Sequence, residues 1–391
     1  MIQFHFFFAD QHRPIHTMKR LFILLSLFFS SQLVALPIPS APDLDAKSYH
    51  MIDFQSGEVL ASKDADLRLA PASMTKIMTA LIVFREINLG NLSLTEKMRV
   101  SEKAWRTPGS RMFIEVNKFV SIDDLLHGML VQSGNDATVA LAEHIAGDES
   151  TFSQLMNQVA QQLGMTNSHF INSSGLPDDN HYSSARDLAI LTRALIKESP
   201  TLYKINAIKT FTYNGITQQN RNKLLWRDDS VDGVKTGHTE DAGYCLVSSA
   251  VRDDMRLISV VMGTDSIAAR NNVNQALLNY GYRFYTTHLL YKSQQSLADA
   301  RVWKGEQQQL SVGLADDLYL TIPRNQYKHL DASLELLPQL TAPINKNQTV
   351  GTAVIKLNSE IIAQRPLVAL QDIAEGSLMQ VLKDKALLMF E

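Results

Sequence analysis

The sequence predicts a chain of mixed α/β (α+β) class, in which a sheet covered by helices precedes a small all-β domain. Its 391 residues exceed the length of one average domain, so two domains are expected. Strand-like segments lie at both ends of residues 36–288 with helical segments between them, which favours a mixed sheet covered by helices. Beyond residue 288, short segments of alternating polarity are separated by Pro and Asn turns, which is typical of all-β domains.

Residues 1–35 have the pattern of a secretory signal peptide. The basic pair Lys19-Arg20 precedes an apolar run over residues 21–29, and small residues follow up to Ala35. This run is shorter than the ~20 residues that a membrane-spanning helix needs. We therefore expect cleavage after Ala35 and export of the mature protein. Residues 1–17 precede this pattern and indicate an over-extended start site.

Hydrophobic periodicity predicts the elements of the region 36–288. Residues 48–62 alternate around a Gln-Ser-Gly turn, which is typical of a β-hairpin. Pro71 opens an apolar segment that continues to Phe84 and predicts a buried helix. The other predicted elements are helices over residues 121–131, 151–163, 184–196 and 268–285, a helix ending at residue 145, and strands over residues 210–213 and 243–262.

The C-terminal part divides into an all-β domain over residues 289–376 and a terminal helix over residues 377–391. The helix has an apolar side and a polar side, and it is compatible both with packing on the protein and with lying in a membrane surface. The strands expected in the domain are residues 300–302, 309–312, 318–322 and 351–357. The helix places Leu378, Met379, Leu382, Ala386, Met389 and Phe390 on one side, and Gln380, Lys383 and Asp384 on the other.

Charge and composition exclude several classes of function. With a net charge of −3, the chain lacks the excess of basic residues that is typical of nucleic-acid-binding proteins. A single cysteine, Cys245, excludes a disulfide framework and a cysteine-based metal site. The eleven histidines show no His-Glu-x-x-His or comparable spacing. We therefore expect neither a metal ion nor another cofactor.

Three short motifs in the first domain carry the predicted chemistry. In the Ser-x-x-Lys motif, Ser73 and Lys76 are one helical turn apart, so the amine can reach the hydroxyl and accept its proton. The Ser-Gly-Asn motif, residues 133–135, interrupts a helix where a loop can direct polar groups into a cleft. The Lys-Thr-Gly motif, residues 235–237, begins a strand. Its glycine allows close approach by a ligand, and its Lys and Thr offer a charge and a hydroxyl to a carboxylate.

The three motifs in this order resemble those of the active-site-serine penicillin-recognising enzymes. Their neighbours are similar to those of the low-molecular-mass D-alanyl-D-alanine carboxypeptidases, in the segments 71–76, 133–137, 183–187 and 232–239. The resemblance covers residues 36–288 and implies a β-lactamase/transpeptidase-like domain with a central antiparallel sheet. The β-domain and terminal helix also look like this family, which favours membrane anchoring by residues 377–391.

The resemblance implies a role for each motif residue. Ser73 would attack the carbonyl between the last two D-alanines and form an acyl-enzyme. Lys76 would act as its base, with a pKa kept low by burial and by Lys235. Ser133 would relay protons to the leaving amine and help to activate the deacylating water, and Asn135 would hold the substrate amide.

The same resemblance implies how the substrate is held. The backbone N–H groups of Ser73 and His238 would form an oxyanion hole. The terminal carboxylate would be received by Thr236, Thr239 and Arg270 beside Gly237, and Arg221 matches a further arginine of the cleft. The implied partners are peptidoglycan pentapeptides and, as covalent inhibitors, β-lactams. The implied location is the periplasm, on the outer face of the inner membrane.

The motifs do not encode whether water or an amine is the acceptor, so an endopeptidase or transpeptidase use of the same site stays open. Two alternative functions also remain open at this stage. A class A β-lactamase would need an acidic residue that activates water, and the loop 172–182 offers Asp178 and Asp179 but no Glu-x-x-Leu-Asn. A β-lactam or cell-wall sensor would keep the reactive serine but release no product. Asp187 is interpreted as a structural or capping residue of the 184–196 helix rather than as a base.

Overall fold

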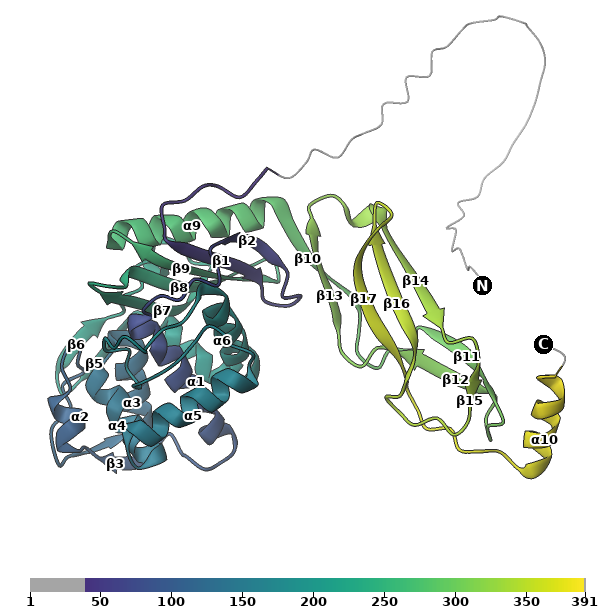
Figure 1. The fold of residues 1–391 in the computed structure, drawn as a ribbon. Coiled ribbons are helices and arrows are strands. Elements are labelled where there is room, and N and C mark those ends of the chain that lie inside the picture. The colour runs from purple at the N-terminus through teal and green to yellow at the C-terminus, as the bar shows by residue number, and fades with distance from the viewer. Residues whose placement is uncertain (1–38, 390–391) are drawn as a thin grey trace, which may run out of the picture. The chain divides into compact units, whose positions relative to one another are not determined.

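The structure is a computed structural model that describes residues 39–389 (Figure 1). The predicted signal peptide, residues 1–35, lies outside the described residues. Among the helices of residues 39–389, none combines the length and the apolar character needed to cross a membrane.

A five-stranded sheet forms the centre of the first domain, in the order β2-β1-β9-β8-β7. All four pairings between neighbouring strands are antiparallel, which confirms the predicted central antiparallel sheet. β2 and β7 therefore form the two edges of this sheet. The strands are β1 (Ser48–Asp53), β2 (Val59–Lys63), β7 (Val231–Thr239), β8 (Gly243–Arg252) and β9 (Met255–Thr264).

Helices cover both faces of the sheet (Figure 1). α9 (Ile267–Phe284) packs on β8 and β9, whereas α6 (Ala185–Glu198) packs on β1 and β9. The other helices of the domain are α1 (Lys76–Asn88), α2 (Glu102–Arg106), α3 (Ile122–His127), α4 (Asn135–Ala146), α5 (Glu149–Gln162), α7 (Pro200–Tyr203) and α8 (Leu224–Arg227). The domain also has two small antiparallel strand pairs. β3 (Lys97–Arg99) pairs with β4 (Phe119–Ser121), with α2 between them in the chain, and β5 (Thr210–Tyr213) forms a hairpin with β6 (Ile216–Gln219).

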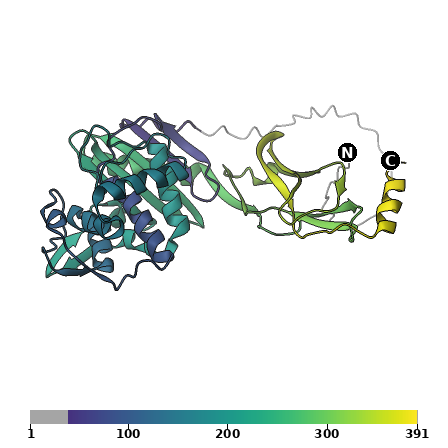
Figure 2. The same ribbon diagram turned by 60° about the horizontal axis from the view of Figure 1, so that its bottom comes forward.

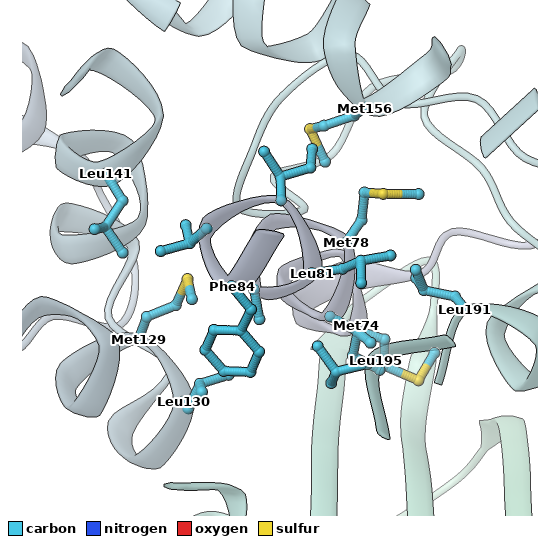
Figure 3. Packing of buried hydrophobic residues seen from close by; sticks show 14 of the residues in the cluster. Met74, Met78, Leu81, Phe84, Met129, Leu130, Leu141, Met156, Leu191 and Leu195 are labelled. Atoms are coloured by element: carbon cyan, nitrogen blue, oxygen red, sulfur yellow. The ribbon is translucent and has the colours of Figure 1, made fainter. Parts of the chain in front are cut away.

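The centre of the domain is α1, whose residues from Lys76 to Phe84 are all buried. A helix that is apolar nearly all round must be enclosed on every side, as the sequence predicts. Figure 3 shows Met78, Leu81 and Phe84 of α1 among apolar side chains of the surrounding elements. This packing fixes the start of α1, and with it Lys76, relative to the rest of the domain.

Up to its last helix, the second domain is built of strands, apart from one short 3-10 helix (Tyr327–His329). A six-stranded sheet has the order β14-β16-β17-β12-β11-β15, and β10 pairs with β13. The four segments predicted here fall within β11, β12, β13 and β16, which confirms the all-β assignment. The bounds are β10 (Tyr285–Tyr291), β11 (Ala298–Trp303), β12 (Gln309–Gly313), β13 (Leu318–Pro323), β14 (Leu330–Leu336), β15 (Leu340–Thr341), β16 (Thr349–Leu357) and β17 (Glu360–Ala369).

The terminal helix α10 (Leu378–Leu387) is attached to the β-domain by its polar side. The Asp384 carboxylate is 2% exposed, accepts a hydrogen bond from Lys304 N, and is also bonded by the Gln380 amide at 2.9 Å. The opposite side leaves Leu378 and Met379 83% exposed. Figures 1 and 2 both show α10 at one end of the strands of this domain.

Candidate active site

Ser73 and Lys76 lie together at the beginning of α1. The sequence predicts that Ser73 opens the helix, but it lies in a 3-10 turn, Ala72–Thr75, and the α-helix begins only at Lys76. The Lys76 amine still reaches Ser73 Oγ at 3.1 Å, because residues three apart share one side in either kind of helix. Burial lowers the pKa of Lys76 to about 7, with a further lowering by Arg221. At neutral pH a substantial fraction of Lys76 is therefore an uncharged amine.

Two oxygen acceptors fix the Lys76 amine beside Ser73. Asn135 Oδ1 and the Ser174 carbonyl oxygen each lie 2.7 Å from Lys76 Nζ. Ser174 belongs to the loop 172–182, which is held against α1 by a hydrogen bond from Thr79 Oγ1 to the Ser173 carbonyl. The loop passes very close to the 3-10 turn, and Gly175, with φ of +85°, has no room for a Cβ there.

Ser133 and Lys235 form a second hydroxyl–amine pair. Ser133 follows a π-helical turn, Gly128–Gln132, and adopts a left-handed conformation with φ of 70°. Lys235, on β7, donates to Ser133 Oγ at 2.8 Å and to the Thr236 carbonyl at 3.2 Å. Burial holds the pKa of Lys235 well below its ordinary value, and the positive charge of Lys76 adds to this effect.

Asp136 is a functional-site residue that the motifs do not identify. It is fully buried at the start of α4, where its carboxylate accepts hydrogen bonds from four backbone N–H groups. Three of these donors are consecutive and belong to a segment that is distant in sequence, and they hold that segment against the Ser-Gly-Asn turn. The donors and their distances are Met112 (3.0 Å), Phe113 (2.9 Å), Ile114 (3.2 Å) and Ala137 (2.9 Å).

We expect Asp136→Ala to lower the free energy of unfolding by about 3 kcal/mol or more, because it leaves several buried backbone N–H groups without an acceptor. Urea denaturation of the two proteins measures this difference. The matched control is Asp179→Ala, which replaces an exposed carboxylate in the loop 172–182 and should change stability by less than about 0.5 kcal/mol. Equal stability of the two variants would contradict the anchoring role of Asp136.

The Lys-Thr-Gly motif lies on β7 at the sheet edge next to the 3-10 turn. A Cβ on Gly237 would lie 2.8 Å from the Pro71 carbonyl oxygen, so only glycine allows this approach without a shift. Thr236 is buried, whereas His238 is exposed and its ring lies 4.0 Å from that of Tyr244. The Thr239 hydroxyl accepts a hydrogen bond from Ala242 N at 3.1 Å, which closes the turn after β7.

Arg270 and Arg221 line one cleft of about 240 Å³. Arg270, at the start of α9, donates to the Gly237 carbonyl at 3.3 Å, and burial lowers its pKa to about 10. Arg221 is held through Nε by the Gln132 carbonyl at 3.3 Å. Its neighbour Asn222 fixes the segment by donating to the Gly233 carbonyl at 2.9 Å. The cleft therefore presents the positive charges of Arg221, Arg270 and Lys223 to a ligand, and Arg270 links it to the Lys-Thr-Gly strand through Gly237.

Asp187 and Cys245 have structural rather than catalytic roles. Asp187 Oδ2 accepts hydrogen bonds from Asn167 N at 2.8 Å and Ser168 Oγ at 2.7 Å, and the N-cap of α6 is Ser184. This agrees with the structural interpretation of Asp187. Cys245 is buried, and burial raises the pKa of its thiol to about 11, so the thiolate is not available near neutral pH.

The three motifs thus meet at one place although they are far apart in sequence. The first and second are joined by the hydrogen bond from Lys76 to Asn135, and the second and third by that from Lys235 to Ser133. The third is packed on the first where Gly237 meets Pro71. A hydroxyl next to a partly neutral amine is suited to nucleophilic catalysis, and the nearby arginines are suited to binding an anion.

The described residues contain no group of three or more His, Cys, Asp and Glu side chains that could hold a metal ion. The side chains that the three motifs bring together are hydroxyls, amines and an amide. The sequence alone identifies the side chains of the three motifs, whereas it does not identify the Ser174 carbonyl, because any residue type can supply a main-chain acceptor.

Comparison with known proteins identifies two families along the chain. A sequence profile described as D-alanyl-D-alanine carboxypeptidase matches residues 36–266, and one described as penicillin-binding protein 5, C-terminal domain, matches residues 285–375. The chain is 44% identical over 361 residues to the D-alanyl-D-alanine carboxypeptidase DacA of Escherichia coli (strain K12), covering 90% of each protein. It is 40% identical to DacA of Haemophilus influenzae, covering 88% of this chain and 89% of that protein.

Solved structures agree with this result. The crystal structure of penicillin binding protein 5 from Haemophilus influenzae matches with a TM-score of 0.84 at 40% identity, covering 86% of this chain and all of that chain. Penicillin-binding protein D2 from Listeria monocytogenes, solved in its ampicillin-bound form, matches with a TM-score of 0.57 at 31% identity. That match covers 62% of this chain and all of that chain.

Proposed function

Because this chain belongs to the D-alanyl-D-alanine carboxypeptidase family, we propose that it uses Ser73 to release the last D-alanine from peptidoglycan pentapeptides. The observation that carries the assignment is the hydrogen bond of 3.1 Å between Ser73 Oγ and the buried amine of Lys76. A serine hydroxyl is a weak nucleophile at neutral pH and needs an adjacent base. Lys76, with a pKa of about 7, is such a base.

In the acylation step, neutral Lys76 accepts the Ser73 proton while Oγ bonds to the carbonyl carbon between the two D-alanines. The negative charge that develops on the carbonyl oxygen is stabilised by the backbone N–H groups of Ser73 and His238, acting as an oxyanion hole. Asn135 supports this step in two ways. Its side-chain oxygen accepts a hydrogen bond from Lys76, and its side-chain amide can hold the substrate backbone.

Ser133 and Lys235 transfer protons to the leaving amine of D-alanine and from the water that attacks the acyl-enzyme. Their hydrogen bond of 2.8 Å forms a path along which a proton can pass to the leaving amine of D-alanine. In hydrolysis of the acyl-enzyme, the same pair accepts a proton from water while the water oxygen bonds to the acyl carbon. The bond from that carbon to Ser73 Oγ then breaks, and Lys76 returns to Oγ the proton that it accepted. The reaction therefore begins and ends with a free Ser73 hydroxyl.

The terminal carboxylate is the group that defines the substrate. Arg270 and Arg221 present positive charge in the cleft, and Thr236 and Thr239 offer hydroxyls along β7. Burial of Arg270 removes competing water, which strengthens its attraction for a carboxylate. Peptides with a free C-terminal carboxylate are therefore favoured over amidated ones.

The activity is tested by incubating the mature protein with diacetyl-Lys-D-Ala-D-Ala and quantifying free D-alanine. We expect one D-alanine to be released for each peptide consumed, and none from the same peptide with a C-terminal amide. Labelling by a fluorescent penicillin without release of D-alanine would instead indicate a sensor. Rapid penicillin hydrolysis would indicate a β-lactamase.

One observation favours the carboxypeptidase over the β-lactamase. The two carboxylates of the loop 172–182, Asp178 and Asp179, are exposed, and the group that this loop presents to Lys76 is the main-chain carbonyl of Ser174. A carbonyl oxygen cannot take a proton from water in the way a carboxylate can. We therefore infer slow hydrolysis of the penicilloyl-enzyme, so that β-lactams act as covalent inhibitors.

We further propose that the mature protein works outside the cytoplasm and rests on a membrane through α10. The basic pair Lys19-Arg20 and the apolar run that follows support export. The exposed apolar side of α10 supports an interfacial anchor, because the buried Asp384 holds the polar side against the β-domain. These two features support a location in the periplasm, on the outer face of the inner membrane.

We expect the double variant Met379→Asp/Leu382→Asp to bind anionic lipid vesicles at least roughly tenfold more weakly, because each residue loses apolar burial worth about 1.5–3 kcal/mol. Sedimentation with the vesicles measures the bound fraction. The control is Leu337→Asp/Ile361→Asp, in which two exposed apolar residues of the β-domain are changed. Equal loss in both variants would show that binding is not specific to α10.

A further inference from the structure

A second groove, of about 400 Å³, lies between α6 and the hairpin β1–β2. It is separate from the site described above, because β2 forms the opposite edge of the five-stranded sheet from β7, which carries Lys235. Its volume is within the range of ligand-binding clefts. None of the residues that line it belongs to the three motifs.

Three cationic residues of α6 line this groove. Arg186, Arg193 and Lys197 are spaced by seven and four residues, so they share one side of the helix and span about 16 Å. Arg186 is paired with Asp66 at 2.8 Å. Arg193 and Lys197 form no ion pair with a carboxylate among the described residues. The groove therefore has an excess of positive charge at these two residues.

The Arg193 guanidinium is fixed in place before any ligand arrives. Its Nε donates to the Phe54 carbonyl at 2.6 Å and its Nη2 to the Gln55 carbonyl at 2.8 Å. Nη1 lies only 3.3 Å from where a Cβ on Gly57 would be, and Gly57 has φ of +79°. The two carbonyl oxygens orient the guanidinium but carry no net charge, so its positive charge is not neutralised. A carboxylate would therefore bind to a charged group that is already held in place.

Two other polar residues line the groove, His50, which is hydrogen-bonded to Ser62, and Glu198, whose carboxylate is paired with Arg85 at 2.7 Å. Its remaining lining is mainly apolar. Ile52 and Val59 face each other across β1 and β2, and Val59 is 43% exposed. Ile190 and Ala194 lie between the cationic residues of α6. β2 has a strand partner on one side only among the described strands. A sheet edge next to a groove is suited to an extended chain rather than to a compact ligand.

We propose that this groove binds a short acidic peptide in an extended conformation. Its carboxylates pair with Arg193 and Lys197, and small apolar side chains between them pack on Ile52 and Val59. Acidic residues at alternate positions of an extended chain lie about 6.6 Å apart. That spacing is close to the ~6 Å of helix axis between Arg193 and Lys197.

The test is fluorescence polarisation of fluorescein-labelled Ala-Glu-Ala-Glu-Ala with the mature protein at low salt. This peptide lacks D-alanine, so its binding does not depend on the proposed catalytic activity. We expect Ala-Gln-Ala-Gln-Ala to bind at least about tenfold more weakly. We expect Lys197→Glu to raise the Kd about fivefold and Arg193→Gln/Lys197→Gln to raise it at least tenfold. Equal binding of the two peptides would overturn the proposal.

Lys197→Glu and two further variants, Lys346→Glu and Arg221→Gln, make the test decisive. Lys197 is exposed and its charge is unpaired, so Lys197→Glu keeps the fold and provides the test even if the change at Arg193 loosens the hairpin turn. Lys346→Glu, an exposed lysine of the β-domain, is the matched control and should leave the Kd unchanged. If Lys197→Glu has no effect while Arg221→Gln abolishes binding, the peptide lies in the catalytic cleft and the proposal is wrong.

Discussion

Replacing Ser73 with alanine should lower the rate of D-alanine release by a factor on the order of 10⁴ or more, because the variant has no nucleophile to form the acyl-enzyme. Covalent labelling by a fluorescent penicillin should disappear at the same time. The loss is chemical rather than structural, since Ser73 contributes one hydroxyl at a partly exposed position. D-alanine release and gel fluorescence measure the two effects.

The matched control for this variant is Ser333→Ala, on β14 of the other domain. It should retain full activity and full labelling. If Ser73→Ala is still labelled, the nucleophile is another residue. If it loses labelling but keeps releasing D-alanine, the acyl-enzyme is not on the reaction path.

Replacing Lys76 with methionine should slow acylation by about 10²–10⁴-fold, the usual contribution of a general base. Methionine keeps much of the buried volume but cannot accept a proton. In the unmodified protein, Lys76 accepts the Ser73 proton only when it is neutral, which is the form above its pKa of about 7. The rate of acylation should therefore rise between pH 6 and 8 and level off above, and stopped-flow penicillin binding measures it.

Lys76→Arg tests whether Lys76 acts by accepting a proton or by its positive charge. Arginine retains the positive charge but is not deprotonated in proteins, so this variant should be as slow as Lys76→Met. Activity close to that of the unmodified protein in Lys76→Arg would mean that charge, not proton transfer, is what Lys76 supplies. A pH profile that is flat from 6 to 8 would contradict the assignment in the same way.

The sequence could predict the three motifs and their order, because each is a local pattern with a local structural role. It could not predict Asp136 as an anchor, since its partners Met112 to Ile114 are more than 20 residues away and are main-chain groups. The same applies to His181, whose Nε2 lies 2.8 Å from Thr75 Oγ1. Such contacts depend on how the chain returns on itself, and side-chain chemistry alone does not encode that.

The elements of the fold also divide into those that the sequence could predict and those that it could not. The first hairpin and the buried α1 could be predicted from hydrophobic periodicity. The single strand predicted over residues 243–262 is in fact two strands, β8 and β9, joined by a turn after Arg252. β14 and β17 could not be predicted, because much of each strand is exposed and β17 contains Pro366. The π-helical turn before Ser133 also gives no periodic signal. In α10, the sequence places Asp384 on the polar side, but only the structure shows that this side is covered by the β-domain.

The most direct test of the central claim is mass spectrometry of the mature protein after brief reaction with benzylpenicillin. We expect one penicilloyl adduct per molecule, on the proteolytic peptide that contains Ser73, and no adduct on the Ser133 peptide. An adduct on Ser133, or none on either peptide in a protein that releases D-alanine, would contradict it.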